Sequence, residues 1–185
     1  MLDLKRQYYN LYISRPYLDL KDREGCRKRF NYIKKIWDGR SLIIVEGTKT
    51  RLGVNNDLFS NAKSIKRIIG PSKNAFNVIN EIKYKTEEYA RPEDLILIAL
   101  GPTATILAYE LAKDGFQAID IGHIDIEYEW YLRNANSKIP IPGKYVNEAS
   151  DKGGNKPDDS IINDEYLSQI ICTIVETNYE KSNIN

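Results

Sequence analysis

The sequence predicts an α/β fold in which helices cover both faces of a parallel sheet. Short apolar runs rich in β-branched residues alternate with stretches whose apolar residues recur every three or four positions. The turns between them are short and contain glycine or proline. Such alternation is typical of strand–helix–strand units, and a length of 185 residues corresponds to one domain. We therefore expect a single Rossmann-like domain over residues 1–185.

The amino-terminal part is expected to lead into the sheet. Residues 1–18 are rich in tyrosine and show no clear period, so we expect a leading segment that packs on another part of the protein. Residues 19–37 are predicted to be helical, because Phe30, Ile33 and Trp37 recur at spacings of three and four.

Four short apolar runs are predicted to be strands, with helical patterns between and after them. The strands are expected at 42–45, 64–69, 95–100 and 118–121, and the helices at 74–89, 105–114 and 126–133. The run at 95–100 is the most apolar in the sequence, which is expected of a central strand.

The carboxy-terminal part is more polar. Residues 134–160 contain proline and glycine among polar residues, so we expect a loop or flap rather than core. Residues 166–175 are apolar enough for a last strand or a helix, and residues 176–185 are expected to be a frayed tail.

The composition excludes several classes of protein. The chain has 27 basic and 26 acidic side chains, a formal net charge of +1, whereas a nucleic-acid-binding protein usually shows a basic excess or stripe. Its two cysteines lie far apart and no histidine cluster accompanies them, which excludes a zinc-finger pattern. The sequence has neither a run of 18 apolar residues nor a secretory signal, so we expect a cytoplasmic protein without a transmembrane segment.

Polar residues that follow the predicted strands are the first candidates for a site, because ligands of parallel sheets bind beyond the carboxyl ends of the strands. After the first strand come Glu46, Arg51, Asn56 and Asp57. Arg51 can hold a phosphate through two parallel hydrogen bonds. Asn56 and Asp57 either cap the next helix or bind a ribose and a base.

Glycine-containing turns follow two further strands. Lys73, in the turn at 70–74, can supply charge to a phosphate, and the alternative is an ordinary turn. Gly101 and Thr103 open a predicted helix, whose N-terminus can bind an anion through its unpaired N–H groups. No Gly-Lys-Ser/Thr follows, so the pattern indicates a phosphate site but not a Walker A loop.

The densest polar group spans residues 120–130, which hold four carboxylates and the only histidine. Asp125 and Glu127 are two residues apart, so both face one side if the segment is extended, and paired carboxylates suit Mn²⁺ or Mg²⁺. His123 can act as a general base, a phosphate partner or a metal ligand, and its alternative is a packing role. Acidic residues at a helix start are also ordinary dipole partners, which weakens the case for Glu127 and Glu129.

Five blocks of the sequence together resemble the GT-D-type glycosyltransferase family, in the family's order and over about residues 14–148. The blocks are 44–47 (Ile-Val-Glu-Gly), 51–59 (Arg-Leu-Gly-Val-Asn-Asn-Asp-Leu-Phe), 72–76 (Ser-Lys-Asn-Ala-Phe), 97–104 (Leu-Ile-Ala-Leu-Gly-Pro-Thr-Ala) and 120–130 (Asp-Ile-Gly-His-Ile-Asp-Ile-Glu-Tyr-Glu-Trp).

The resemblance implies a Rossmann-like domain that binds UDP and a divalent metal, Mn²⁺ or Mg²⁺, and transfers a hexose from a UDP-sugar to a glycan or glycoprotein. It implies an Asp-x-Glu metal motif, which we place at Asp125 and Glu127. It also implies that His123 and Glu129 lie beside the transferred sugar, as catalytic residues. The nucleotide pocket is expected to hold Glu46, Arg51, Asn56, Asp57, Lys73, Gly101 and Thr103.

One departure from the family leaves an alternative open. Family members carry a Gly-Asp-Gly-Glu element before an Arg-Pro-Tyr block, and here Arg15-Pro16-Tyr17 lies near the start with no such element before it. The alternative to an active transferase is therefore a truncated or degenerate copy that binds nucleotide or partners another glycosyltransferase. A third interpretation, a phosphatase or nucleotide hydrolase, lacks the post-strand Asp-x-Asp that it would need.

Overall fold

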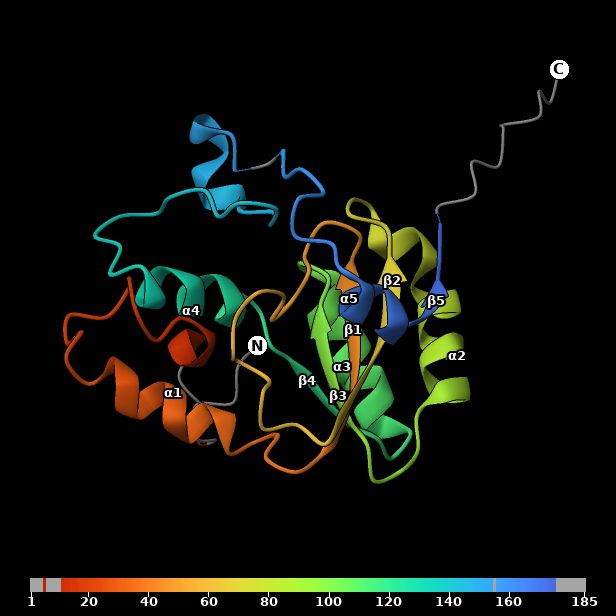
Figure 1. Cartoon of the computed structure of the whole chain (residues 1–185). Helices are drawn as coiled ribbons and strands as arrows, with labels where there is room; N and C mark the ends of the chain where they lie inside the picture. Colours follow the sequence, from red (N-terminus) through yellow and green to blue (C-terminus); the bar gives the residue numbers. More distant parts are fainter. Residues whose placement is uncertain (1–4, 6–10, 155, 176–185) are drawn as a thin grey trace, which may run out of the picture.

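The computed structural model contains a five-stranded parallel sheet and describes residues 5, 11–154 and 156–175. The strand order is β4-β3-β1-β2-β5, and every neighbouring pair is parallel, which confirms the predicted α/β fold (Figure 1). The strands are β1 (Ser41–Gly47), β2 (Ser64–Gly70), β3 (Leu95–Ala99), β4 (Gln117–Asp120) and β5 (Ile170–Thr173).

The strand order places a topological switch point beside β1. The chain runs from β1 to β2 on one side, and then crosses to β3 and β4 on the other. The middle position thus belongs to β1, while β3, predicted to be central, is an interior strand between β1 and β4 with all five residues buried. Ligands of doubly wound sheets bind where the strand order reverses, outside the carboxyl ends of the strands.

Two pairs of helices cover the two faces of the sheet (Figure 1). One face packs against α2 and α3 through Ile43, Val45 and Ile96, and the opposite face packs against α1 and α4 through Leu42 and Ile44. The alternation of buried side chains along each strand explains why one strand serves two cores. The helices are α1 (Cys26–Lys34), α2 (Ile79–Tyr89), α3 (Thr103–Lys113), α4 (Ile124–Leu132) and the short α5 (Asp164–Gln169), with 3-10 helices at Leu11–Ser14, Ala75–Val78 and Asn147–Lys152.

Several predicted boundaries differ from the structure. The helix expected at 19–37 is limited to α1, because Asp22 closes a turn before it by accepting a hydrogen bond from the Gly25 N–H at 3.0 Å. The region 166–175 is neither all helix nor all strand, since α5 gives way to β5 at residue 170. Most important for the site, α4 starts at Ile124 rather than at 126, so Asp125 is helical as well as Glu127, and the extended arrangement that would turn both carboxylates to one side does not form.

The segment 134–160 lies above α4 and the carboxyl ends of the strands in Figure 1. Its irregular backbone agrees with the predicted loop, but the expectation that it stays out of the core is wrong. Ile141, Val146 and Ala149 are buried in the core on the α1–α4 side of the sheet. This segment therefore contributes side chains to the core, and it borders the region where a site is expected.

The predicted leading segment packs as expected where it is described. Tyr17 is buried, and its ring contacts that of Tyr131 on α4 at a centroid distance of 5.9 Å. The predicted tail at 176–185 and most of residues 1–10 lie outside the described residues. Within the described residues, none of the helices has both the length and the apolar character needed to cross a membrane.

Candidate active site

A cleft of about 890 Å³ lies at the carboxyl edge of the sheet. Residues directly after β1, β2, β3 and β4 form its floor and walls, at the switch point where such folds bind ligands. Its volume falls in the range of small-molecule and cofactor sites. The predicted site residues that line it are Lys73, Gly101, Thr103, His123 and Asp125.

One wall of the cleft suits a phosphate group. Gly101 and Thr103 stand where β3 passes into α3, and Lys73 is an exposed cation in the turn after β2. Gly101 has a φ of 55°, a left-handed backbone conformation that glycine adopts without strain. The N–H groups of the first turn of α3 and the Lys73 ammonium together provide positive potential on this side.

A second wall carries His123 in contact with two residues that the sequence did not single out. Its Nε2 lies 2.8 Å from Glu148 Oε1, and its Nδ1 lies 3.1 Å from the guanidinium of Arg15. Arg15 also donates to Glu148 Oε1 at 2.9 Å. The arrangement fits a neutral imidazole that donates from Nε2 to Glu148 and accepts at Nδ1 from Arg15. Burial would raise the pKa of Glu148, but the hydrogen bonds from His123 and Arg15 lower it to about 2.

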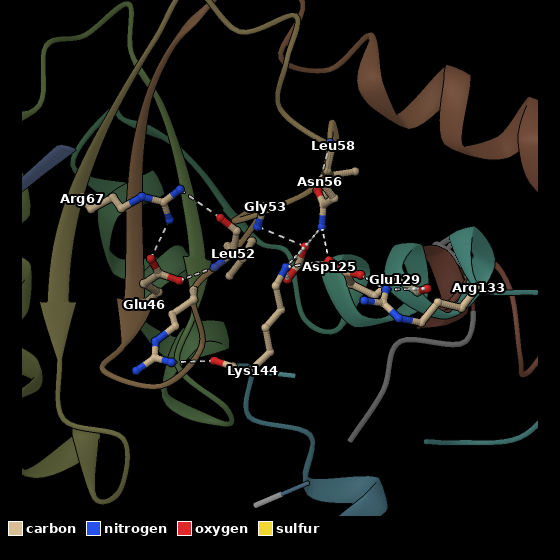
Figure 2. A network of polar contacts seen from close by, with 12 residues as sticks. Glu46, Leu52, Gly53, Asn56, Leu58, Arg67, Asp125, Glu129, Arg133 and Lys144 are labelled. Carbon is tan, nitrogen blue, oxygen red and sulfur yellow. Dashed lines mark hydrogen bonds and ion pairs between the residues drawn. The ribbon is translucent and has the colours of Figure 1, made fainter. Parts of the chain in front are cut away.

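Asp125 forms the floor of the cleft and belongs to a buried network of polar groups (Figure 2). Its Oδ1 accepts from the Gly53 N–H at 3.0 Å and from Asn56 Nδ2 at 2.8 Å. The ammonium of Lys144 lies 3.0 and 2.7 Å from its two oxygens. The carboxylate is therefore surrounded by donors, and its position under the cleft is fixed.

Glu129, predicted to be catalytic, lies in the same network but not among the residues that line the cleft. It accepts from Asn56 at 2.7 Å, lies 3.0 Å from the Lys144 ammonium, and pairs with Arg133. Burial alone would raise the pKa of Glu129, but Lys144 and the hydrogen bonds from Asn56 and Arg133 hold it below its usual value. Glu129 thus supports the floor of the cleft from below.

Glu127 faces another part of the molecule. Its Oε2 accepts from the backbone N–H groups of Tyr17 and Leu18, both at 2.9 Å, and burial raises its pKa. Its Oε1 is buried without a hydrogen-bond partner. Residues two apart on a helix point in different directions, so Asp125 and Glu127 do not meet.

The predicted Asp125–Glu127 pair does not fit a single divalent cation. Asp125 already has an ammonium against both oxygens, and Glu127 bonds the leading segment. Among the residues that the structure describes, no cluster of three or more histidine, cysteine or acidic side chains is arranged to hold a metal ion. We therefore assign no cation to these two residues.

Glu46 and Arg51, predicted for the nucleotide pocket, hold the scaffold of the cleft. Glu46 is fully buried between Arg67, at 2.6 Å, and the Leu52 N–H, at 2.7 Å, and burial raises its pKa in spite of Arg67. The Arg51 guanidinium donates to the Gly143 carbonyl at 2.6 Å and also contacts the Asp158 carbonyl and the Asp159 carboxylate. Neither residue lines the cleft.

Asn56 and Asp57 cap no helix, and their side chains bond other parts of the protein. Asn56 accepts from the Leu58 N–H at 3.0 Å and donates to the carboxylates of α4, so it ties the loop after β1 to that helix. Asp57 accepts from Lys34 at 2.8 Å and from the Tyr128 hydroxyl at 2.6 Å, and these contacts lower its pKa. Both residues lie outside the lining of the cleft.

Sequence reasoning missed Arg15, Lys144 and Glu148, although all three lie at or beside the cleft. The available signal was the run Gly143-Lys-Tyr-Val-Asn-Glu148, in which charged residues stand within an irregular but partly apolar stretch. The sequence offers no sign that Lys144 meets Asp125 or that Glu148 meets His123, because those contacts join distant segments.

The chain matches a family model described as "Glycosyltransferase GT-D fold" over residues 1–149. It is 44% identical over 169 residues to "Glycosyltransferase GlyD" of Streptococcus pneumoniae serotype 4 (strain ATCC BAA-334 / TIGR4), covering 91% of this chain and 20% of that protein. It is 44% identical over 170 residues to "Probable glycosyl transferase Gly" of Streptococcus gordonii, covering 91% of this chain and 24% of that protein. The chain thus spans about a fifth to a quarter of the length of these relatives.

Solved structures give the same result. One, described as "The highly conserved domain of unknown function 1792 has a distinct glycosyltransferase fold", superposes with a TM-score of 0.81 at 44% identity, covering 89% of this chain and 57% of that one. Another, "A New Glycosyltransferase (DUF1792) from Streptococcus sanguinis", has a TM-score of 0.80 at 43% identity, covering 88% of this chain and 59% of that one.

Proposed function

Because the chain belongs to the GT-D family of glycosyltransferases, we propose that its cleft binds a UDP-sugar and transfers the hexose to a hydroxyl group of a glycan or glycoprotein. The observation that carries this proposal is the pair of facing walls at the switch point. A cationic wall with Lys73 and the start of α3 lies in the same cleft as a wall with a histidine–glutamate pair.

The cationic wall suits the diphosphate of the donor. The N–H groups at the start of α3 and the Lys73 ammonium would bind the phosphate oxygens and stabilise the negative charge of the departing UDP. Phe76, a half-exposed ring in the same cleft, offers a flat apolar surface for the uracil. The hexose would then lie over the floor formed by Asp125, near His123.

The transfer step needs a proton acceptor. The acceptor oxygen forms a bond to the anomeric carbon while the bond from that carbon to the phosphate oxygen breaks, and UDP leaves with the bonding electrons. The hydroxyl proton passes to His123 Nδ1 once the hydroxyl has replaced the Arg15 contact there. Glu148, at 2.8 Å from Nε2, then stabilises the imidazolium.

A divalent cation is a separate part of the proposal. The family resemblance implies Mn²⁺ or Mg²⁺, and these ions bind carboxylates together with substrate phosphates. Since the Asp125–Glu127 pair does not fit one ion, we propose that such a cation reaches the cleft with the diphosphate and takes its protein ligands from other residues.

Calorimetric titration of UDP, with and without Mn²⁺, tests the donor site. Replacing Lys73 by alanine should weaken UDP binding about tenfold, because a charge-assisted hydrogen bond is lost. The control is Lys63→Ala, which removes an equally exposed lysine from the opposite end of β2. His123→Ala should abolish transfer from UDP-hexoses while leaving UDP affinity unchanged. A wild-type protein that binds no UDP under either condition contradicts the proposal.

A second candidate function is that of a module that binds nucleotide and partners another glycosyltransferase but does not itself catalyse transfer. The observation in its favour is that both nitrogens of His123 and both oxygens of Asp125 already have partners. UDP binding without hexose transfer or UDP-sugar hydrolysis, in the presence of acceptor glycans, would support this candidate over the first.

A further inference from the structure

Lys144 is a charged side chain held almost entirely inside the protein. Its side chain is 1% exposed, and its ammonium lies between two carboxylates of α4 (Figure 2). The nitrogen is 2.7 Å from Asp125 Oδ2 and 3.0 Å from Glu129 Oε1. A buried ammonium is costly unless carboxylates compensate its charge, and the two carboxylates of α4 lie close enough to do so.

The same position would suit a metal ion if the lysine were absent. Asp125 and Glu129 are separated by one helical turn and direct one oxygen each at the point that the ammonium occupies. Hard divalent cations prefer such oxygen atoms, at about 2.0–2.6 Å. An ammonium already at this point excludes a divalent ion on grounds of both space and charge.

Lys144 also anchors the segment that borders the cleft. We define residues 143–148 as the strap. Arg51 holds the Gly143 carbonyl at 2.6 Å, and the Tyr145 N–H donates to the Lys49 carbonyl at 2.9 Å, so contacts on either side of Lys144 attach the strap to the loop after β1. Tyr145, Asn147 and Glu148, which follow the lysine, line the cleft.

We propose that Lys144 is the resident cation of the Asp125–Glu129 carboxylates: its ammonium occupies the point that a divalent ion would need, and it thereby positions the strap so that Glu148 meets His123. Lys144 is thus a positioning residue. This assignment does not rest on the proposed function, because it states which cation occupies a buried site when no nucleotide is bound.

Binding of Mn²⁺ to the nucleotide-free protein, followed by electron paramagnetic resonance, tests this assignment. The wild type should bind no Mn²⁺ that depends on Asp125, so Asp125→Asn should leave its Mn²⁺ binding unchanged. Lys144→Met, which keeps the length of the side chain and removes the charge, should gain a Mn²⁺ site. The double variant Asp125→Asn/Lys144→Met should lose that site again. A gained metal site is a result that general loosening of the structure does not produce.

Lys152→Met is the matched control, because it makes the same substitution at an exposed lysine in the 3-10 helix Asn147–Lys152, just after the strap. It should gain no Mn²⁺ site. Hydrogen exchange of the amides in the strap should rise at least about tenfold in Lys144→Met and stay unchanged in Lys152→Met.

Three results would overturn the proposal. The first is Mn²⁺ bound by the wild type and lost in Asp125→Asn. The second is a folded Lys144→Met that gains no Mn²⁺, or whose gained Mn²⁺ survives in the double variant. The third is unchanged exchange in the strap of Lys144→Met. If Lys144→Met does not fold, the comparison of wild type with Asp125→Asn still decides the cationic role. If only the proposed function is wrong, the protein should bind no UDP, while Mn²⁺ binding by the wild type and the variants should still follow the results expected above.

Discussion

Glu148 shows how a single residue links the strap to the cleft and how pH should affect that link. His123 and Arg15 hold its pKa at about 2, below the ordinary 4.5, in spite of its partial burial. A carboxylate with a depressed pKa stabilises the fold above its ordinary pKa, and that contribution is lost as the pH falls through the folded value. The window for Glu148 therefore lies between about 4.5 and 2.

We predict that Glu148→Gln lowers the free energy of unfolding at about pH 6 by at most about 3 kcal/mol, which is the energy equivalent of the pKa shift. The difference from wild type should shrink as the pH falls below about 4.5. Urea unfolding of both proteins at several pH values measures this. A difference that stays constant from pH 6 down to about 3 would show that Glu148 acts through packing rather than through its charge.

Among single residues, the sequence predicted several that line the cleft, but not the contacts that hold them. Lys73 is predicted from its turn after a strand, and His123 and Asp125 from the dense polar group at 120–130; all three line the cleft. Glu46, near the end of β1, and Arg51, in the loop after it, turn inward instead, because Arg67 and the Gly143 carbonyl are their partners. Those partners lie in other parts of the chain, and position after a strand does not reveal them.

At the scale of elements, α1 illustrates stability that comes from one face of a helix. Phe30 is 1% exposed and packs against the rings of Tyr128 and Tyr131 on α4 at centroid distances of 4.8 and 5.1 Å. Tyr32 on the same helix is 56% exposed. Because α4 carries Asp125 and Glu129, the contact between α1 and α4 also supports the floor of the cleft.

We predict that Phe30→Ala lowers the free energy of unfolding by about 3–5 kcal/mol, from lost burial and the cavity left behind. Tyr32→Ala should change it by no more than about 0.5 kcal/mol, since an exposed ring has little burial to lose. Urea unfolding monitored by circular dichroism measures the free energy of unfolding of the two variants and of the wild type. Equal losses for both variants would contradict the assignment of Phe30 as the packing residue of α1.

The start of α4 is the element boundary on which the metal prediction depended. The alternation Asp-x-Glu places both carboxylates on one side if the backbone is extended. A helix that begins at 126 leaves Asp125 outside the helix, where the backbone can still be extended. The left-handed Gly122, with a φ of 53°, ends the turn after β4, and the helix then begins at Ile124. A shift of two residues thus separates the carboxylates, although the order of strands and helices from α1 to α4 agrees with the prediction.

Over the molecule as a whole, the fold packs an apolar core against each face of the sheet and gathers its polar cleft at the carboxyl edge. Each face of the sheet has one core, which includes residues of both helices on that face. The cleft, most of the strap and the left-handed turns at Gly101 and Gly122 lie at the carboxyl edge. A ligand bound at this edge contacts four strand ends at once, so it should stabilise the sheet as a unit.

UDP at a hundredfold excess over its dissociation constant should stabilise the protein by about 2.7 kcal/mol if it binds only the folded state. For a chain of this length, that corresponds to a rise in the midpoint of thermal unfolding of roughly 5–10 °C. Hydrogen exchange should slow in the turns after β1, β2, β3 and β4 and in the strap, which border the cleft, while α5 and β5 should exchange as before. Scanning calorimetry and exchange mass spectrometry with increasing UDP measure both effects. Protection centred on α5 rather than on the four strand ends would place the nucleotide in the smaller cavity of about 420 Å³ between the loop at 53–60 and α5, and would remove the role proposed for Lys73 and α3.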